Sequence, residues 1–132
     1  MSKGVLKRVR NLNPSINSAS EYYFCKVEEK YAGDEEYWLI TQNQLEYFLD
    51  RAIENAEDIP QTLEVGEFQH VENKKAHRMA REFYIAAVLE LEEEGIDILM
   101  TSHELSVIRE RVEDNREDIE ANKEHWLFDL FD

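Results

Sequence analysis

The chain has 132 residues, with 30 acidic and 15 basic side chains, a formal charge of −15 and one cysteine. This length predicts a single domain with a modest core. One cysteine excludes an intrachain disulfide and is typical of a reducing compartment, so we expect a cytoplasmic protein. The charge argues against direct binding to nucleic acid or to an anionic membrane. No apolar run approaches the roughly 20 residues that a transmembrane helix needs.

The charge divides the chain unevenly. Residues 1–20 carry four bases and no acid, and the rest of the chain is strongly acidic. Four bases are too few for a nucleic-acid-binding arm, so we interpret the leader as a flexible start or as a strand that folds back on the acidic body. No internal repeat is evident. The single domain, 1–132, is then a basic leader and loop (1–20), an α+β body (21–100), and a long helix with an apolar tail (101–132).

An aromatic-rich segment, 21–31, predicts a strand with Tyr23, Cys25 and Val27 on one face and Tyr22 and Phe24 on the other. Gly33 lies in the expected turn, and 36–40 is the returning strand. Because a lone hairpin is marginal in water, it needs a third strand or a helix packed against it, and 5–9 or 61–65 could supply that strand. Cys25 is interpreted as a small buried apolar residue and not as a nucleophile.

Two helices are expected in the body. Thr41 and Gln44 fit a capping box that opens the first, which runs to about Asp58 with an apolar stripe at helical spacing. The second covers 73–94 and is apolar nearly all round, so it should be the central helix. The segment 96–100 is either a short buried strand or an apolar connector. The expected core comprises Phe24, Trp38, Ile40, Leu45, Leu49, Ile53, Met79, Phe83, Ala87 and Leu91.

A third helix begins at a second capping box, Thr101 and Glu104, and runs to about His125. Seven of its residues alternate spacings of three and four, which is a heptad seam. The seam consists of Leu105, Ile108, Val112, Asn115, Ile119, Asn122 and Trp126. This pattern predicts self-association as a homodimer or homotrimer. The alternative is a monomeric helix whose two asparagines face water. For the apolar tail 126–131 three roles are open: it docks on its own domain, it caps a coiled coil, or it anchors a partner.

The segment 112–122 resembles the Val/Ile-x-x-Asn repeat of trimeric stalks in phage fibres and surface adhesins. The resemblance implies that Asn115 and Asn122 form polar layers inside a coiled coil, where buried asparagines set the register. Together these elements predict an α+β fold. A small antiparallel hairpin or three-stranded sheet packs on two to three helices, and a long C-terminal helix partly projects.

Enzyme templates fail on residue type or spacing. There is no glycine-rich phosphate loop, no Gly-x-Ser-x-Gly turn and no His-Glu-x-x-His pair. A metal site across Glu67, His70 and His77 is conceivable, but solvated or capping histidines explain the same residues. The glutamates at 90–94 are interpreted as a solvated helix end. We therefore expect no enzymatic activity, no cofactor and no bound metal.

The acidic body supplies the leading functional hypothesis. Carboxylates fixed on rigid helices can imitate a row of phosphates, so a basic protein surface that binds nucleic acid could bind this one; the alternative is that the charge only confers solubility. The expected partner-binding residues are Asp34, Glu35, Glu36, Glu46, Asp50, Glu54, Glu110, Glu113, Asp114, Glu117, Asp118 and Glu120.

In size and charge the chain resembles the small acidic accessory proteins of tailed phages, several of which block host enzymes by posing as DNA. The resemblance implies an inhibitor or modifier of a nucleic-acid-handling protein, located in the host cytoplasm. The rival hypothesis is a structural module, of virion or scaffold type, that assembles through the helix 101–126.

Overall fold

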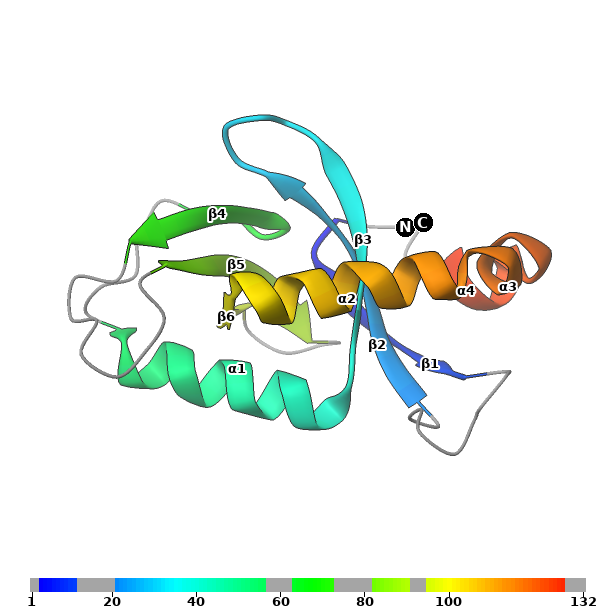
Figure 1. The fold of residues 1–132 in the computed structure, drawn as a ribbon, viewed down its shortest axis with the longest axis horizontal. Coiled ribbons are helices and arrows are strands. Elements are labelled where there is room, and N and C mark those ends of the chain that lie inside the picture. The colour runs from blue at the N-terminus through cyan, green and yellow to red at the C-terminus, as the bar shows by residue number, and fades with distance from the viewer. Residues whose placement is uncertain (1–2, 12–20, 57–62, 73–81, 91–94, 128–132) are drawn as a thin grey trace.

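The computed structural model describes residues 3–11, 21–56, 63–72, 82–90 and 95–127 (Figure 1). The described residues form one mixed six-stranded sheet and four helical segments. The strands are β1 (Val5–Arg10), β2 (Glu21–Glu29), β3 (Glu35–Ile40), β4 (Glu67–Glu72), β5 (Glu82–Glu90) and β6 (Gly95–Thr101). The helices are α1 (Gln42–Glu54), α2 (Ser102–Asp114), α3 (Arg116–Ala121) and α4 (Lys123–Leu127).

The sheet has an unusual centre. Strand β2 pairs with β3 along one edge, and its other edge is shared by β1, which is antiparallel, and β4, which is parallel. Strand β5 has the same arrangement, with β6 on one edge and both β4 and β1 on the other. Strands β1 and β4 therefore lie end to end between β2 and β5, and β3 and β6 form the two outer edges.

The two halves of the chain repeat one pattern, β1-β2-β3-α1 and β4-β5-β6-α2. The antiparallel pair Tyr23↔Ile40 has its counterpart in Tyr84↔Met100. The parallel pairs also exchange, since Glu28↔Glu67 corresponds to Leu89↔Val5. A two-fold axis relates contacts in this reciprocal way. The fold is therefore an internal duplication about a pseudo-two-fold axis through the centre of the sheet.

The sequence retains traces of this duplication, although none is evident without the structure. Thr101 follows Thr41 by sixty positions, and each opens the helix of its half. Identical residues occupy equivalent positions at Gly4 and Gly66, Val9 and Val71, Tyr23 and Tyr84, Val27 and Val88, Leu39 and Leu99, Leu45 and Leu105, Arg51 and Arg111, and Asn55 and Asn115. The interpretation of the chain as free of repeats is therefore wrong at the level of the fold.

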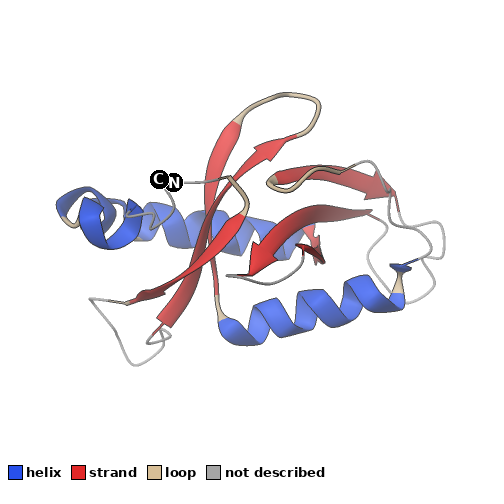
Figure 2. Ribbon diagram, turned by 180° about the vertical axis from the view of Figure 1, so that it is seen from behind, coloured by secondary structure: helices blue, strands red, loops and turns tan. Residues whose placement is uncertain are grey.

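The helices are exchanged between the halves. Helix α1 follows β3 but packs on β6, and α2 follows β6 but packs on β3. Arg51 of α1 donates to the Leu99 carbonyl at 3.2 Å, and Arg111 of α2 donates to the Leu39 carbonyl at 2.7 Å. Figure 2 shows β2 and β3 crossing in front of α2 when the molecule is seen from behind. The two halves are thus interlocked.

Both predicted capping boxes are confirmed, at Thr41 with Gln44 and at Thr101 with Glu104. In each capping box, the side chain of the third helical residue also accepts a hydrogen bond from an arginine of the other helix. Arg51 donates to Glu104 Oε1 at 2.5 Å, and Arg111 donates to Gln44 Oε1 at 2.9 Å. The residue that closes each helix N-terminus therefore also holds the two helices together.

Two glycines meet at the pseudo-two-fold axis. Gly4 and Gly66 both have positive φ, 80° and 91°, which favours glycine. Their amides donate to the Lys26 and Ala87 carbonyls at 2.7 Å each. A Cβ placed on Gly4 would lie 2.4 Å from the Gly66 nitrogen. Strands β1 and β4 can start this close together only because neither residue has a side chain.

The core lies on both faces of the sheet. The largest cluster contains Tyr23, Cys25 and Val27, and the opposite face of β2 places Tyr22 and Phe24 in a second cluster. The predicted division of this strand into two faces is therefore confirmed. Most predicted core residues that the structure describes are buried, but Ile53 is 73% exposed, so its assignment to the core is wrong.

The predicted fold class is wrong in its sheet and in its last helix. The sheet has six strands, and the hairpin β2-β3 is only one part of it. The expected central helix over 73–94 is contradicted by β5, which covers 82–90. A continuous apolar run does not distinguish a buried helix from a strand covered on both faces, and here it is a strand. Ala76, Met79, Ala80 and Leu91, which were expected on an apolar stripe of this helix, lie outside the described residues.

No long C-terminal helix is present in 101–127. Asn115 and Asn122 end the successive segments α2 and α3, and they do not continue one helix. The Asn115 side-chain amide donates to the Arg111 carbonyl at 2.7 Å, as that of Asn55 does to the Arg51 carbonyl at 2.8 Å. An asparagine side chain that bonds the carbonyl four residues back favours termination, because such local bonds compete with the regular hydrogen-bond pattern of the helix.

Candidate interaction surface

The predicted acidic residues fall into three groups: the tip of the β2-β3 hairpin, helix α1, and the segment α2-α3. In both Figure 1 and Figure 2 the tip and α1 lie on opposite sides of α2. The structure therefore does not gather all of these carboxylates on one face, and each group has to be considered separately.

The hairpin tip uses most of its charge internally. Glu36 accepts two hydrogen bonds from Arg109, both of 2.6 Å, and this contact raises the pKa of Arg109. Glu35 forms a longer ion pair of 3.6 Å with Lys26. Asp34 is the exposed carboxylate that remains at the tip. Figure 1 shows the tip projecting beyond the sheet. Because Glu36 and Glu35 are already paired within the chain, only a small part of the charge at the tip is available to a partner.

Helix α1 presents its carboxylates together. Glu46, Asp50 and Glu54 are all exposed and follow one another at intervals of four residues, which places them in a row along one side of the helix. The opposite side buries an apolar stripe that includes Leu45 and Phe48. We call Glu46, Asp50 and Glu54 the α1 acidic row.

The α2-α3 segment is more mixed. Glu110, Asp114, Glu117 and Glu120 are exposed. Two further carboxylates are engaged: Glu113 pairs with Arg116, and Asp118 accepts hydrogen bonds from Asn122 at 2.8 Å and from the Trp126 indole at 3.2 Å. Asp118 thus helps to hold α4 against α3 and is only partly exposed.

The predicted self-association residues are largely used inside the chain. Leu105 and Ile108 belong to the main core, and Trp126 is fully buried beside Phe24 at a ring distance of 5.5 Å. Val112 and Ile119 are partly buried against the same second cluster. Asn115 and Asn122 cap the ends of α2 and α3. The continuous helix that the assembly hypothesis requires is therefore absent from the described chain.

Because these seam residues pack within the chain, their replacement should affect the stability of the protein and not its oligomeric state. Replacing Val112 and Ile119 by Asp should lower the free energy of unfolding by about 1 kcal/mol each, because their apolar area is partly buried within the chain. The sedimentation coefficient of the native protein should not change. Urea unfolding followed by circular dichroism, together with sedimentation velocity, would check both parts. Dissociation of a dimer or trimer by these variants would contradict this assignment.

The remaining candidate groups offer little reactive chemistry. Cys25 is fully buried, and burial raises the pKa of its thiol to about 12, so the thiol is protonated at neutral pH. Residue 77 of the conceivable metal site lies outside the described chain, and the described residues contain no group of three metal-ligating side chains. No described helix combines the length and apolarity needed to cross a bilayer.

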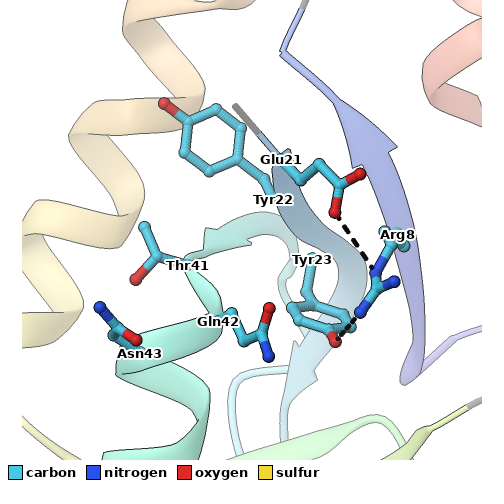
Figure 3. A pocket seen from close by; sticks show the side chains of 7 residues that line it. All are labelled: Arg8, Glu21, Tyr22, Tyr23, Thr41, Gln42 and Asn43. Atoms are coloured by element: carbon cyan, nitrogen blue, oxygen red, sulfur yellow. Dashed lines mark hydrogen bonds and ion pairs between the residues drawn. The ribbon is translucent and has the colours of Figure 1, made fainter. Parts of the chain in front are cut away.

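A pocket of about 260 Å³, open to solvent, lies beside the N-terminus of α1 (Figure 3). Arg8 points into it, and its guanidinium contacts Tyr23 at 3.0 Å and Glu21 at 3.7 Å. The other lining residues are Tyr22, Thr41, Gln42 and Asn43. The Thr41 hydroxyl already accepts a hydrogen bond from the backbone amide of Gln44 in the capping box. The lining residues include no nucleophile hydrogen-bonded to a base, which is the arrangement that covalent catalysis uses.

Two exposed apolar residues on α1 were missed by sequence reasoning. Tyr47 is 58% exposed, and Ile53, which was expected in the core, is 73% exposed. Both flank the α1 acidic row. The exposure of Tyr47 could have been predicted, because this residue lies off the apolar stripe of α1. Ile53 lies at the border of the stripe, where residue spacing alone does not decide whether a side chain is buried.

The comparisons with known proteins add no family to this description. No family model, no curated protein and no solved structure matches the chain.

Proposed function

We propose that this protein is a non-enzymatic inhibitor or modifier that occupies the basic surface of a nucleic-acid-handling protein. The observation that carries the proposal is the set of exposed carboxylates on the helices. On α1, α2 and α3, the exposed carboxylates that make no ion pair among the described residues are Glu46, Asp50, Glu54, Glu110, Asp114, Glu117 and Glu120.

Rigid placement makes these carboxylates suitable for recognition. Helices α1 and α2 are each held by a capping box, and the Arg51–Glu104 ion pair of 2.5 Å joins them. A charge on a fixed backbone costs less conformational entropy on binding than a charge on a loop. The overall charge of −15 would also accelerate encounter with a basic partner and repel nucleic acid itself. The resemblance in size and charge to acidic phage accessory proteins agrees with this role.

The experiment is an affinity capture on the immobilised full chain, with nucleic-acid-binding proteins from a bacterial lysate as the input. Captured protein should be released by moderate salt, because screening weakens contacts between exposed charges. Duplex DNA added at unchanged ionic strength should release the same protein, since both ligands would compete for one basic surface. Capture that persists at high salt, or that duplex DNA does not reverse, would contradict nucleic-acid mimicry.

A variant that lacks these seven charges provides the control. Changing the seven exposed helix carboxylates above to Asn or Gln keeps their size and removes their charge. The variant should remain folded, because these side chains are solvent-exposed, and it should capture nothing that duplex DNA competes for. Undiminished capture by the folded variant would show that the carboxylates do not carry the binding.

A further inference from the structure

The internal duplication allows one helix to serve as a reference for the other. Positions 47, 50, 53 and 54 of α1 correspond to positions 107, 110, 113 and 114 of α2, because the two helices start after Thr41 and Thr101 and so align with an offset of sixty residues. Asp50 and Glu54 correspond to Glu110 and Asp114, so both helices carry the same acidic pair. Any difference between the other residues of the two faces is then not required by the fold.

The apolar residues make that difference. Where α1 has the exposed Ile53, α2 has Glu113, and where α1 has the exposed Tyr47, α2 has Val107, which is partly buried. Glu113 shows that a charged side chain is tolerated at this position of the fold. An isoleucine that is 73% exposed at the equivalent site therefore has no packing role that explains it.

Helix geometry places the apolar residues on either side of the charges. At 3.6 residues per turn, Glu46, Asp50 and Glu54 run along the middle of the exposed side of α1, with Tyr47 at one border and Ile53 at the other. Arg51 lies beneath Tyr47, at 4.5 Å from its ring centroid, and this contact supports the ring in its exposed position. We call these five residues, 46, 47, 50, 53 and 54, the outer face of α1.

We infer that the outer face of α1 is a docking site for a basic amphipathic helix of a partner protein. This inference rests on the proposed function and names the contact surface for it. Apolar side chains of the partner helix would cover Tyr47 and Ile53, and its lysines or arginines would lie along the acidic row, as when two amphipathic helices pack side by side. Charge excludes the other occupants: a second copy would place carboxylate against carboxylate, and an anionic lipid surface would be repelled.

The test uses the full chain and a fluorescein-labelled leucine–lysine peptide that folds as an amphipathic helix. A second peptide has the same composition in a scrambled order that is not amphipathic. Fluorescence anisotropy would give the Kd of each peptide at low and at physiological ionic strength. The wild-type chain should bind the amphipathic peptide more tightly than the scrambled one, because only the former presents its leucines on one side.

Ile53→Glu is the decisive variant, since it installs the residue that α2 carries. The substitution adds negative charge, so a purely electrostatic contact would become stronger. If the outer face of α1 docks a helix through Ile53, the Kd should instead rise about tenfold. Unchanged or tighter binding by Ile53→Glu would overturn the inference.

A matched pair of charge reversals locates the face. The double variant Asp50→Lys with Glu54→Lys should weaken binding about tenfold at low salt. The control variant Glu64→Lys with Glu124→Lys reverses two exposed carboxylates outside the seven proposed to bind, and it should weaken binding less than about twofold. Equal weakening would overturn the docking site and leave the proposed function standing. Absence of salt-sensitive binding of either peptide to the wild-type chain would contradict both. Unchanged melting temperatures would confirm that all variants are folded.

Discussion

Replacing Gly4 by alanine should destabilise the protein by on the order of 4 kcal/mol, or prevent its folding. Two effects combine at this residue. The positive φ of 80° disfavours a side chain by about 1 kcal/mol. The larger effect is steric, because the new Cβ would lie 2.4 Å from the Gly66 nitrogen and 2.5 Å from its Cα. These are backbone atoms at the centre of the sheet, so relief requires β1 and β4 to separate.

Gly33→Ala is the matched control, and Gly66→Ala is an intermediate case. Gly33 also has positive φ, 72°, but its new Cβ would meet nothing nearer than a Glu28 oxygen at 3.7 Å. Gly33→Ala should therefore lower the free energy of unfolding by only about 1 kcal/mol, which is the cost of placing a side chain at positive φ. A Cβ on Gly66 would meet the flexible Lys3 side chain at 2.5 Å and its backbone at 3.0 Å, so its cost should lie between the other two.

Urea unfolding followed by circular dichroism would measure all three. If Gly4→Ala is no more destabilising than Gly33→Ala, the close approach of the two halves at the axis is not as described.

Replacing Arg51 by alanine should also have a large effect, because it should lower the free energy of unfolding by about 3 kcal/mol at neutral pH. The Arg51 side chain is only 10% exposed, and it donates to both Glu104 oxygens and to the Leu99 carbonyl. Its removal leaves a partly buried carboxylate without its cation and separates two helices that belong to different halves. Arg111→Ala should cost less, about 1 to 2 kcal/mol, because its partners Gln44 and the Leu39 carbonyl are neutral.

The cost of Arg51→Ala should depend on pH. Burial raises the pKa of Glu104, but the hydrogen bonds from Arg51 and Thr101 outweigh it, so the pKa lies below the ordinary glutamate value. A depressed pKa in the folded state stabilises the protein above the unfolded-state pKa, and this contribution is lost as the pH falls through the folded-state value.

The difference in free energy of unfolding between wild type and Arg51→Ala should therefore shrink below roughly pH 4. The difference for Arg111→Ala should stay nearly constant, because neither of its partners titrates. Urea unfolding at several pH values would measure both differences. An Arg51→Ala penalty that does not decrease in acid would show that the ion pair is not its source.

Local elements were predictable from the sequence because their signals are local. Thr41 with Gln44 and Thr101 with Glu104 marked both helix starts, since a capping box involves only four consecutive residues. The hairpin β2-β3 and the two faces of β2 followed from alternating β-forming residues. The acidic row of α1 was likewise readable from its spacing.

Two errors came from patterns that fit more than one structure. The run over 82–90 reads equally as a buried helix or a buried strand, and pairing with β4 and β6 decides for the strand. The heptad spacing of 105–126 reads as a coiled-coil seam. The contacts of Trp126 with Phe24 and of the Asn115 side chain with the Arg111 carbonyl instead bend the chain back on its own domain.

By itself the sequence determined the charge, the helix starts, the hairpin and the absence of familiar catalytic motifs, because each of these depends on residues close together in the chain. Only the tertiary structure decided the internal duplication, the exchange of helices between halves and the exposure of Ile53. The duplication and the helix exchange depend on contacts between residues far apart in the chain, such as Val5 with Leu89 and Glu28 with Glu67. The identities that relate the two halves, such as Gly4 and Gly66, are too sparse to reveal a two-fold axis in the sequence.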